Sequence, residues 1–195
     1  MLDPQMQSEQ ALLATDHKLR AEADEMLDVR GLRPLLEEYA PISVVGSYAL
    51  QLMTWRDLDI VMNAPIITIA EFFELGRRVT TLLSAWKSFF TNNRDHSQIP
   101  RGLYWGIRLG DIKKGAWKID LWAFDSDQYS AQTLHCEQLH SRLNAINRLA
   151  ILRLKSRLWN DPRYRDTITS QQIYDAVLKH GVDTLDDFWV LYETK

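Results

Sequence analysis

The chain has 195 residues, of which 46% are hydrophobic and 25% are charged, and this composition argues against a disordered or collagen-like protein. The sequence lacks an apolar run of about 20 residues and shows no apolar leader, so we expect neither a transmembrane helix nor a signal peptide. A single cysteine, Cys136, excludes an internal disulfide framework and fits a reducing compartment, so we expect a cytoplasmic protein. The length fits one domain, or one catalytic core with a small appendage.

Charge is unevenly distributed along the chain, although the formal net charge is only −3. Residues 1–40 carry a net charge of −5, residues 142–165 one of +6, and residues 166–195 one of −4. A basic segment between two acidic ones indicates either a local site for an anion or a solvated helix face. Because the basic residues are confined to one segment, the distribution argues against a long groove that tracks nucleic acid.

Helical and extended patterns alternate in the first third of the chain. Residues 10–27 are rich in Ala, Leu, Glu and Lys without Pro or Gly, which predicts a helix, and residues 32–39 predict a second, short one. Residues 42–45 predict a strand of mainly β-branched residues, and residues 48–55 predict two turns of helix. Residues 57–62 alternate polar and apolar side chains, which is typical of a strand with one buried face.

The middle of the chain is predicted to contain one long helix and a hairpin. Residues 69–90 have the apolar spacing of an amphipathic helix. A polar loop follows over residues 92–100. Residues 103–109 and 116–124 predict two strands, and the connection at 110–115 contains Gly and Asp, as hairpin turns commonly do.

The last third of the sequence is predicted to be helical. The helical patterns cover residues 130–159, residues 170–180 and residues 185–192. We expect an α/β core with N-terminal helices over residues 1–134 and a helical C-terminal part over residues 135–195.

Two acidic side chains share one face of the strand predicted at residues 57–62. Successive side chains of a strand alternate between its faces, so Asp57 and Asp59 project together, about 7 Å apart along the strand, while Leu58 and Ile60 face the core. Two such carboxylates repel each other unless a positive group lies between them. Because hard oxygen ligands suit Mg²⁺, which also takes substrate phosphates as ligands, the pattern indicates a divalent-metal site for a phosphorylated substrate.

The Gly46-Ser47 turn is predicted to supply the complementary half of such a site. It lies between a strand and a helix, where backbone N–H groups are free and the positive end of the helix dipole points outward. Glycine lets a phosphate approach the backbone, and the Ser47 hydroxyl can donate a hydrogen bond to it. We therefore expect a phosphate to bind beside the two aspartates.

The Gly46-Ser47 turn is followed, after nine residues, by Asp57-Leu58-Asp59. This arrangement resembles the signature of the polymerase β-type nucleotidyltransferase superfamily, in which a Gly-Gly or Gly-Ser turn precedes an Asp-x-Asp or Asp-x-Glu strand. The resemblance implies an α/β (α+β) fold with a mixed β-sheet core, flanking helices and a helical C-terminal part. The basic, helical tail also looks like that of small bacterial members.

The superfamily also has a third carboxylate on a later strand. Asp120 is the candidate, because Lys118, Asp120 and Trp122 share one face of the predicted strand by period two. The alternative is that Asp120 merely pairs with Lys118 or Arg108.

The resemblance implies a metal-dependent nucleotidyltransferase, which moves a nucleoside monophosphate from an NTP to a hydroxyl of a small molecule or protein and releases pyrophosphate. Asp57, Asp59 and Asp120 would be the catalytic and metal-binding residues, with Mg²⁺ or Mn²⁺ as the cofactor. Asp120 would also help to take the proton of the acceptor hydroxyl. Gly46 and Ser47 would bind the phosphates of ATP or another NTP.

Basic residues of the tail are candidates for holding the triphosphate. Arg148 and Lys155 are seven residues apart and lie on one stripe of a helix, so they are the favoured nucleotide-binding pair. Surface salt bridging is the alternative role for this pair. Arg56 and Arg108 are further candidates.

Two other clusters carry less information. Trp105, Trp117 and Trp122 lie on the predicted hairpin, where one of them could stack on a nucleobase, although core packing suits most of them. The segment from His135 to His140 lacks the paired spacing of a structural zinc site, and its cysteine fits a small buried residue.

Other functions remain open at the level of sequence. A non-catalytic nucleotide-binding or antitoxin-like interaction protein of the same fold is the main alternative. A nucleic-acid-directed transferase is disfavoured by the overall acidic charge. No membrane partner is expected, and a homodimer stays open because some members of the superfamily complete their site across subunits.

Overall fold

A mixed β-sheet lies at the centre of the computed structural model, which describes residues 4–95, 100–164 and 166–193. Its five strands within this part of the chain have the order β1-β2-β5-β4-β3. The strands are β1 (Ile42–Val45), β2 (Asp57–Asn63), β3 (Lys87–Asn92), β4 (Leu103–Arg108) and β5 (Lys118–Phe124). β2 and β5 run parallel, and the other neighbouring strands run antiparallel. The predicted mixed sheet is confirmed.

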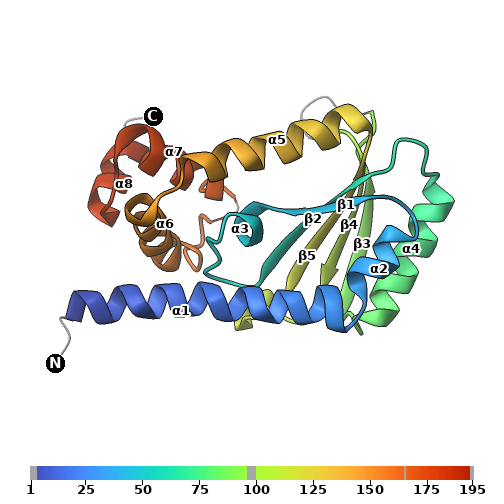
Figure 1. The fold of residues 1–195 in the computed structure, drawn as a ribbon, viewed down its shortest axis with the longest axis horizontal. Helices are drawn as coiled ribbons and strands as arrows, with labels where there is room; N and C mark the ends of the chain where they lie inside the picture. The colour runs from blue at the N-terminus through green and yellow to red at the C-terminus, as the bar shows by residue number, and fades with distance from the viewer. Residues whose placement is uncertain (1–3, 96–99, 165, 194–195) are drawn as a thin grey trace.

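Helices flank the sheet on both sides and gather at one end of the molecule. Figure 1 shows α1 and α5 along opposite sides of the sheet, and α6, α7 and α8 together at the end where both termini lie. The helices are α1 (Pro4–Asp24), the π-helical turn η1 (Glu25–Val29), α2 (Leu32–Glu37), α3 (Gly46–Ala49), α4 (Ile69–Leu82), the 3₁₀ turn η2 (Ile112–Lys114), α5 (Ser126–Arg142), α6 (Ala145–Leu158), α7 (Ser170–His180) and α8 (Leu185–Glu193). None of the helices in the described ranges is long and apolar enough to cross a bilayer.

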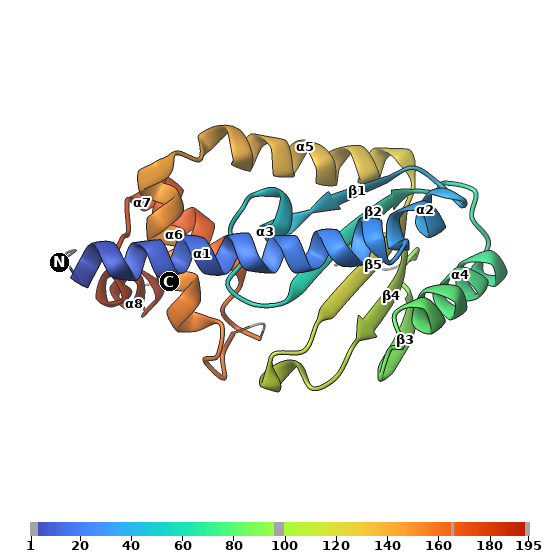
Figure 2. The ribbon, with the colours of Figure 1, turned by 60° about the horizontal axis from the view of Figure 1, so that its bottom comes forward.

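One face of the sheet forms the main hydrophobic core. Alternate residues of the two parallel strands point to this face, and they are fully or almost fully buried: Leu58, Ile60, Ile119 and Leu121. Helix α4 covers them with Phe72 and Leu75, and the buried end of α1 joins the same cluster. Figure 2 shows α1 lying across this side of the sheet.

A second hydrophobic cluster holds the C-terminal helices together. It joins apolar residues of α6, α7 and α8 to Leu50 and Trp55 from the connection before β2. Helix α1 contacts both clusters, because Leu19 is part of the first and Leu12 packs against the second. Leu134 and His135 lie inside the continuous helix α5, and the predicted division of the chain there stays a prediction.

The predicted helix over residues 69–90 is wrong in its second half. Helix α4 ends at Leu82, and residues 87–92 form the edge strand β3. The chain turns at Ser84, whose φ of 51° is in the left-handed region. Left-handed helix ends are usually marked by glycine, so a serine gives little signal. In addition, Phe89 and Phe90 continue the apolar helical spacing.

Two further helix boundaries differ from the predictions. The helix predicted at residues 48–55 is a single turn, α3, which begins at Gly46 and is followed by Gln51 with a φ of 57°. The pattern over residues 130–159 contains two helices, because the Asn144 side chain accepts hydrogen bonds from the first amides of α6 and starts a new helix. Residues 96–99 of the predicted polar loop and residue 165 of the basic segment lie outside the described residues.

Candidate functional site

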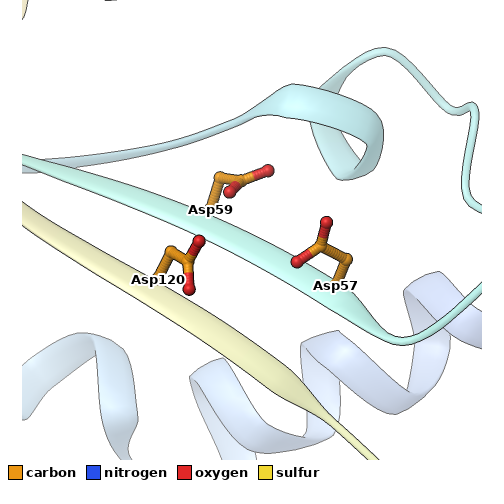
Figure 3. Close-up of side chains that lie close together, drawn as sticks. All are labelled: Asp57, Asp59 and Asp120. Carbon is orange, nitrogen blue, oxygen red and sulfur yellow. The ribbon is translucent and has the colours of Figure 1, made fainter. Parts of the chain in front are cut away.

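Strand register brings the three predicted carboxylates together. In the parallel pairing of β2 with β5, Asp59 lies opposite Asp120, and Asp57 lies opposite Lys118. The three carboxylates point toward one another (Figure 3). By strand alternation they lie on the sheet face opposite the buried Leu58 and Ile60. One oxygen from each lies within 4.8 Å of the others, an arrangement that can hold a metal ion.

A lysine from the same face supplies the positive charge that these carboxylates require. The ammonium nitrogen of Lys118 lies 2.7 Å from Asp57 Oδ1 and 2.7 Å from Asp120 Oδ2. Asp120 also accepts hydrogen bonds from the Tyr104 hydroxyl at 2.8 Å and from Arg108 at 3.2 Å. Both pairings that the sequence offered as alternatives for Asp120 therefore occur, and they coexist with its place in the carboxylate group.

The pKa values of the charged groups in the site are shifted by burial and by their neighbours. Burial raises the pKa of Asp59 to about 7, and the nearby charge of Asp57 adds to this effect. Burial also raises the pKa of Asp57, although Lys118 opposes that shift. Burial alone would lower the pKa of Lys118, but the three carboxylates outweigh it and hold this pKa above its usual value. Asp59 is thus an aspartate that titrates near neutral pH.

The Gly46 turn abuts the acidic group, as predicted. Antiparallel pairing of β1 with β2 places Val45 opposite Asp59, so Gly46 comes next to that carboxylate. Gly46 has a φ of 64°, and a Cβ at this position would lie 2.4 Å from Asp59 Oδ2. Both the backbone conformation and the space therefore require glycine. Ser47, at the start of α3, is buried.

A cavity of about 270 Å³ opens beside Gly46, Ser47, Asp57 and Asp59. Much of its remaining wall comes from elements that lie far apart in the sequence. They include Trp122 and Phe124 of β5, Gln132, His135, Cys136 and Leu139 of α5, and Ser170, Gln171 and Tyr174 of α7. The cavity therefore lies between the sheet and the C-terminal helices.

Aromatic side chains form one wall of this cavity. The rings of Trp122 and Phe124 are stacked with centroids 5.3 Å apart. Trp122 is the tryptophan that contacts the cavity among the described residues, whereas Trp105 and Trp117 belong to the main core. Of the three predicted candidates for stacking on a base, Trp122 is therefore the one in position.

The two basic residues predicted to bind nucleotide differ in their surroundings. Lys155 is 1% exposed, and its ammonium donates to the Leu52 carbonyl at 2.8 Å and to the hydroxyl of Tyr174 at 3.3 Å. Burial lowers the pKa of Lys155 to about 8, against the charges of Asp57 and Asp59. Lys155 thus lies behind a cavity wall and within electrostatic reach of the acids.

Arg148 joins helix α6 to helix α1. Its guanidinium lies 2.7 Å from the carboxylate of Asp16, which is completely buried, and donates to the Gln51 carbonyl at 2.9 Å. Asp16 also accepts a hydrogen bond from the Met53 amide at 2.8 Å. A role for Arg148 in phosphate binding stays a prediction, and it would require these contacts to change.

Other basic residues pair with acidic segments of the same chain. Arg56 makes two hydrogen bonds with Glu22 of α1, at 2.6 and 2.9 Å. Arg153 lies 3.2 Å from Glu9 and 3.2 Å from Asp183. The charge alternation along the sequence is therefore explained in part by contacts between the basic segment and the acidic segments on either side.

Sequence reasoning missed several residues of the site. Lys118 carried a signal, because period two places it on the face of Asp120. Cys136 was expected to be buried, but it is half-buried and lines the cavity, and burial raises its pKa. No local pattern shows that Cys136 and Tyr174 line the same cavity as the aspartates, since α5 and α7 reach the site only through tertiary packing.

Comparison with solved structures identifies the fold. No protein-family model and no curated protein matches the sequence. A cytoplasmic RNA terminal U-transferase is 12% identical, with a TM-score of 0.52 over 88% of this chain and 52% of that chain. The Cid1 poly(U) polymerase with Mg and 3′-dATP bound is 15% identical, with a TM-score of 0.54 over 89% and 55%. The GLD-2/RNP-8 complex is 13% identical, with a TM-score of 0.50 over 87% and 64%.

The chain spans about half the length of the first two of these structures. At such low identity the likeness establishes the fold alone. The chain shares with these structures a mixed sheet flanked by helices, and the predicted fold is confirmed.

Proposed function

We propose that this protein is a metal-dependent nucleotidyltransferase, which moves a nucleoside monophosphate from an NTP to a hydroxyl group and releases pyrophosphate. The observation that carries the proposal is the group of three carboxylates that meets Gly46 at the edge of one cavity. The solved structures that share the fold include RNA terminal transferases, which use this class of reaction.

The donor set of the site suits Mg²⁺ or Mn²⁺. Asp57, Asp59 and Asp120 offer hard oxygen ligands within 4.8 Å of one another, and the Lys118 ammonium shows that a cation fits between two of them. These three aspartates would hold the ion. When bound, it would neutralise charge on the phosphates and lower the pKa of the acceptor hydroxyl.

The chain's own residues would position the nucleotide. Amides of the first turn of α3 have no partner within the helix, so Gly46 and Ser47 can donate to phosphate oxygens. Lys155 places a positive charge behind the cavity, and Trp122 offers a ring face to the base. Asp120 would orient the acceptor hydroxyl and take its proton.

For the acceptor, we propose a hydroxyl of a small molecule or protein. Much of the basic segment pairs with acidic residues of α1 and of the region before α8, which leaves less positive charge for a nucleic-acid backbone. RNA is the competing acceptor, since the solved structures include an RNA terminal U-transferase and a poly(U) polymerase. A cytoplasmic location, expected from the single cysteine, belongs to the same proposal.

Transfer of labelled nucleotide tests the reaction. Each α-labelled NTP would be incubated with the protein, Mn²⁺ or Mg²⁺, and in turn a metabolite extract, a protein extract and a single-stranded RNA. We expect pyrophosphate release and label on a small molecule or protein, both absent in Asp57→Asn. Label on RNA would correct the acceptor, and no pyrophosphate with any pool would contradict the reaction.

A non-catalytic nucleotide-binding or antitoxin-like protein is the second candidate, because Lys118 already pairs with two of the proposed ion ligands. The unique thiol of Cys136, in the cavity wall, can report nucleotide binding by either kind of protein, and pyrophosphate release then separates the two functions. Alkylation of Cys136 should slow when a non-hydrolysable NTP and Mn²⁺ are bound, for an enzyme and a binding protein alike. Protection without pyrophosphate release from any NTP would favour the binding protein.

A further inference from the structure

The Lys118 ammonium lies among the oxygen atoms that would bind an ion. It is 2.7 Å from one oxygen of Asp57 and 2.7 Å from one oxygen of Asp120, and its side chain is only 15% exposed. On another side it lies 5.6 Å from the ring centroid of Trp55, so an aromatic face also stabilises the charge. The lysine is thus seated in the site by three neighbours.

An ion and this ammonium compete for the same carboxylates. Mg²⁺ binds carboxylate oxygens at about 2.0–2.1 Å, closer than the lysine does now. An ion held by the oxygens that now contact Lys118 would lie close to the ammonium nitrogen, and two positive charges at short range in a partly buried site repel strongly. Occupation by both cations in the present geometry is therefore unfavourable.

We propose that Lys118 is an internal counter-cation, which holds the aspartates together without an ion and must leave them before a divalent ion can bridge Asp57 and Asp120. This inference rests on the proposed function, because it concerns the ion of the same site. The displaced ammonium needs another anion, since an unpaired charge is costly in a site that is about 15% exposed. The triphosphate of the nucleotide is the anion that the reaction brings, so ion and nucleotide bind cooperatively.

Lys118→Met is the direct test, because methionine fills similar space without a charge. Mn²⁺ binding without nucleotide would be measured by the electron paramagnetic resonance signal of the free ion. We expect Lys118→Met to bind Mn²⁺ about 10- to 100-fold more tightly than the wild-type protein, the range over which neighbours of metal ligands act. Lys118→Arg keeps the positive charge, so its Mn²⁺ binding should stay as weak as that of the wild-type protein.

Two controls give the result its meaning. Lys179→Met removes a lysine that pairs with Asp175 at 3.0 Å on the exposed surface of α7, and it should leave Mn²⁺ affinity unchanged. Asp59→Asn should weaken Mn²⁺ binding in both the wild-type and the Lys118→Met backgrounds. Mn²⁺ binding by Lys118→Met that is no tighter than that of the wild-type protein would overturn the inference. If Asp59→Asn still weakens Mn²⁺ binding, the proposed function stays intact. Absence of Mn²⁺ binding and of nucleotidyl transfer in every variant would contradict both.

A measurement on the wild-type chain covers the case in which Lys118→Met does not fold. The ¹⁵N resonance of the Lys118 side chain, assigned with Lys118→Arg, would be followed as Mg²⁺ and a non-hydrolysable NTP are added. We expect a clear shift of this resonance when both are present, because the ammonium changes partners. An unchanged resonance at saturating Mg²⁺ and nucleotide would show that the lysine stays with the aspartates, against the inference.

Discussion

The two faces of the parallel strands β2 and β5 show opposite physical chemistry. On one face, Leu58, Ile60, Ile119 and Leu121 are at most 1% exposed and pack under α1 and α4. On the other face, the residues that alternate with them are three aspartates and a lysine. Strand periodicity alone separates the two sets, since neighbouring residues point to opposite sides of a sheet.

The difference shows how a charged site is held in place. Burial of the apolar face favours one register of β2 against β5, and a shift by one residue would expose the whole apolar set. That same register places like charges of Asp57, Asp59 and Asp120 side by side. The apolar face therefore fixes a geometry that the acidic face by itself would disfavour.

The largest expected effect comes from neutralising one aspartate of the site, and it is an effect on the rate of nucleotidyl transfer. We expect Asp59→Asn to lower kcat for nucleotidyl transfer by at least about 10²- to 10³-fold, as loss of one electrostatic contact in an active site does. Thermal unfolding of the ion-free protein should move to the same or a higher temperature, because a buried negative charge is removed.

Asp57→Asn is the matched comparison. It should lower kcat for transfer by a similar factor, but it should lower the unfolding temperature, since Asp57 pairs with Lys118. Equal unfolding temperatures of Asp57→Asn and Asp59→Asn would show that the ion pair with Lys118 does not stabilise Asp57 more than Asp59.

Truncating the apolar face should weaken the fold. Leu121→Ala removes a side chain that is 1% exposed, and we expect it to lower the free energy of unfolding by about 2–5 kcal/mol, measured by urea denaturation. Ile146→Ala, at a residue that is 82% exposed, should change that free energy by less than about 0.5 kcal/mol. A comparable loss from both substitutions would contradict the place of Leu121 in the buried core.

Two glycines with similar φ angles allow the cost of backbone strain to be measured apart from the cost of a steric clash. Gly46 has a φ of 64° and Gly181 a φ of 68°, but a Cβ at Gly46 would meet Asp59 at 2.4 Å whereas one at Gly181 would meet nothing within 4 Å. Gly181→Ala should lower the free energy of unfolding by about 1–2 kcal/mol through strain alone.

Gly46→Ala should lower that free energy further and also weaken nucleotide binding, measured as loss of Cys136 protection. Equal destabilisation by the two alanines would show that Asp59 moves aside without cost.

The acidic face should also make stability depend on pH. The pKa of Asp59 is raised from 3.8 to about 7, so its contribution to stability is complete below about pH 4 and is lost as the pH rises through 7. We expect the free energy of unfolding of the ion-free protein to fall by up to about 1.4 kcal/mol per pH unit in this window. Asp59→Asn should reduce that slope, and part of it should remain because burial also raises the pKa of Asp57. Mn²⁺ binding to the wild-type protein should strengthen over the same range.

The local parts of the site were accessible from the sequence. Gly46, Ser47, Asp57 and Asp59 lie within 14 residues, and the alternation of the strand sets the direction of the acids. The same alternation selects Asp120 on β5, although only the register of the parallel pair shows that it lies opposite Asp59.

The remainder depends on tertiary structure. The cavity walls on α5 and α7 meet the sheet through packing that no local pattern encodes. Strand β3 was missed because the chain turns at Ser84 without a glycine. In addition, Phe89 and Phe90 follow Trp86 by three and four residues, which is the spacing of a helical stripe. The partner of Arg148, the buried Asp16, is 132 residues away along the chain.

The segment between α3 and β2 is held at several points. The Met53 amide donates a hydrogen bond to Asp16, and the Leu52 carbonyl accepts one from Lys155. Arg56 donates to the Glu22 carboxylate. Proteins that close around a substrate usually rotate about such a short connection, but here rotation would break buried polar contacts with α1 and α6. We therefore expect this connection to stay in place when a substrate binds, so that the cavity selects its substrate by the fit of walls that are already formed.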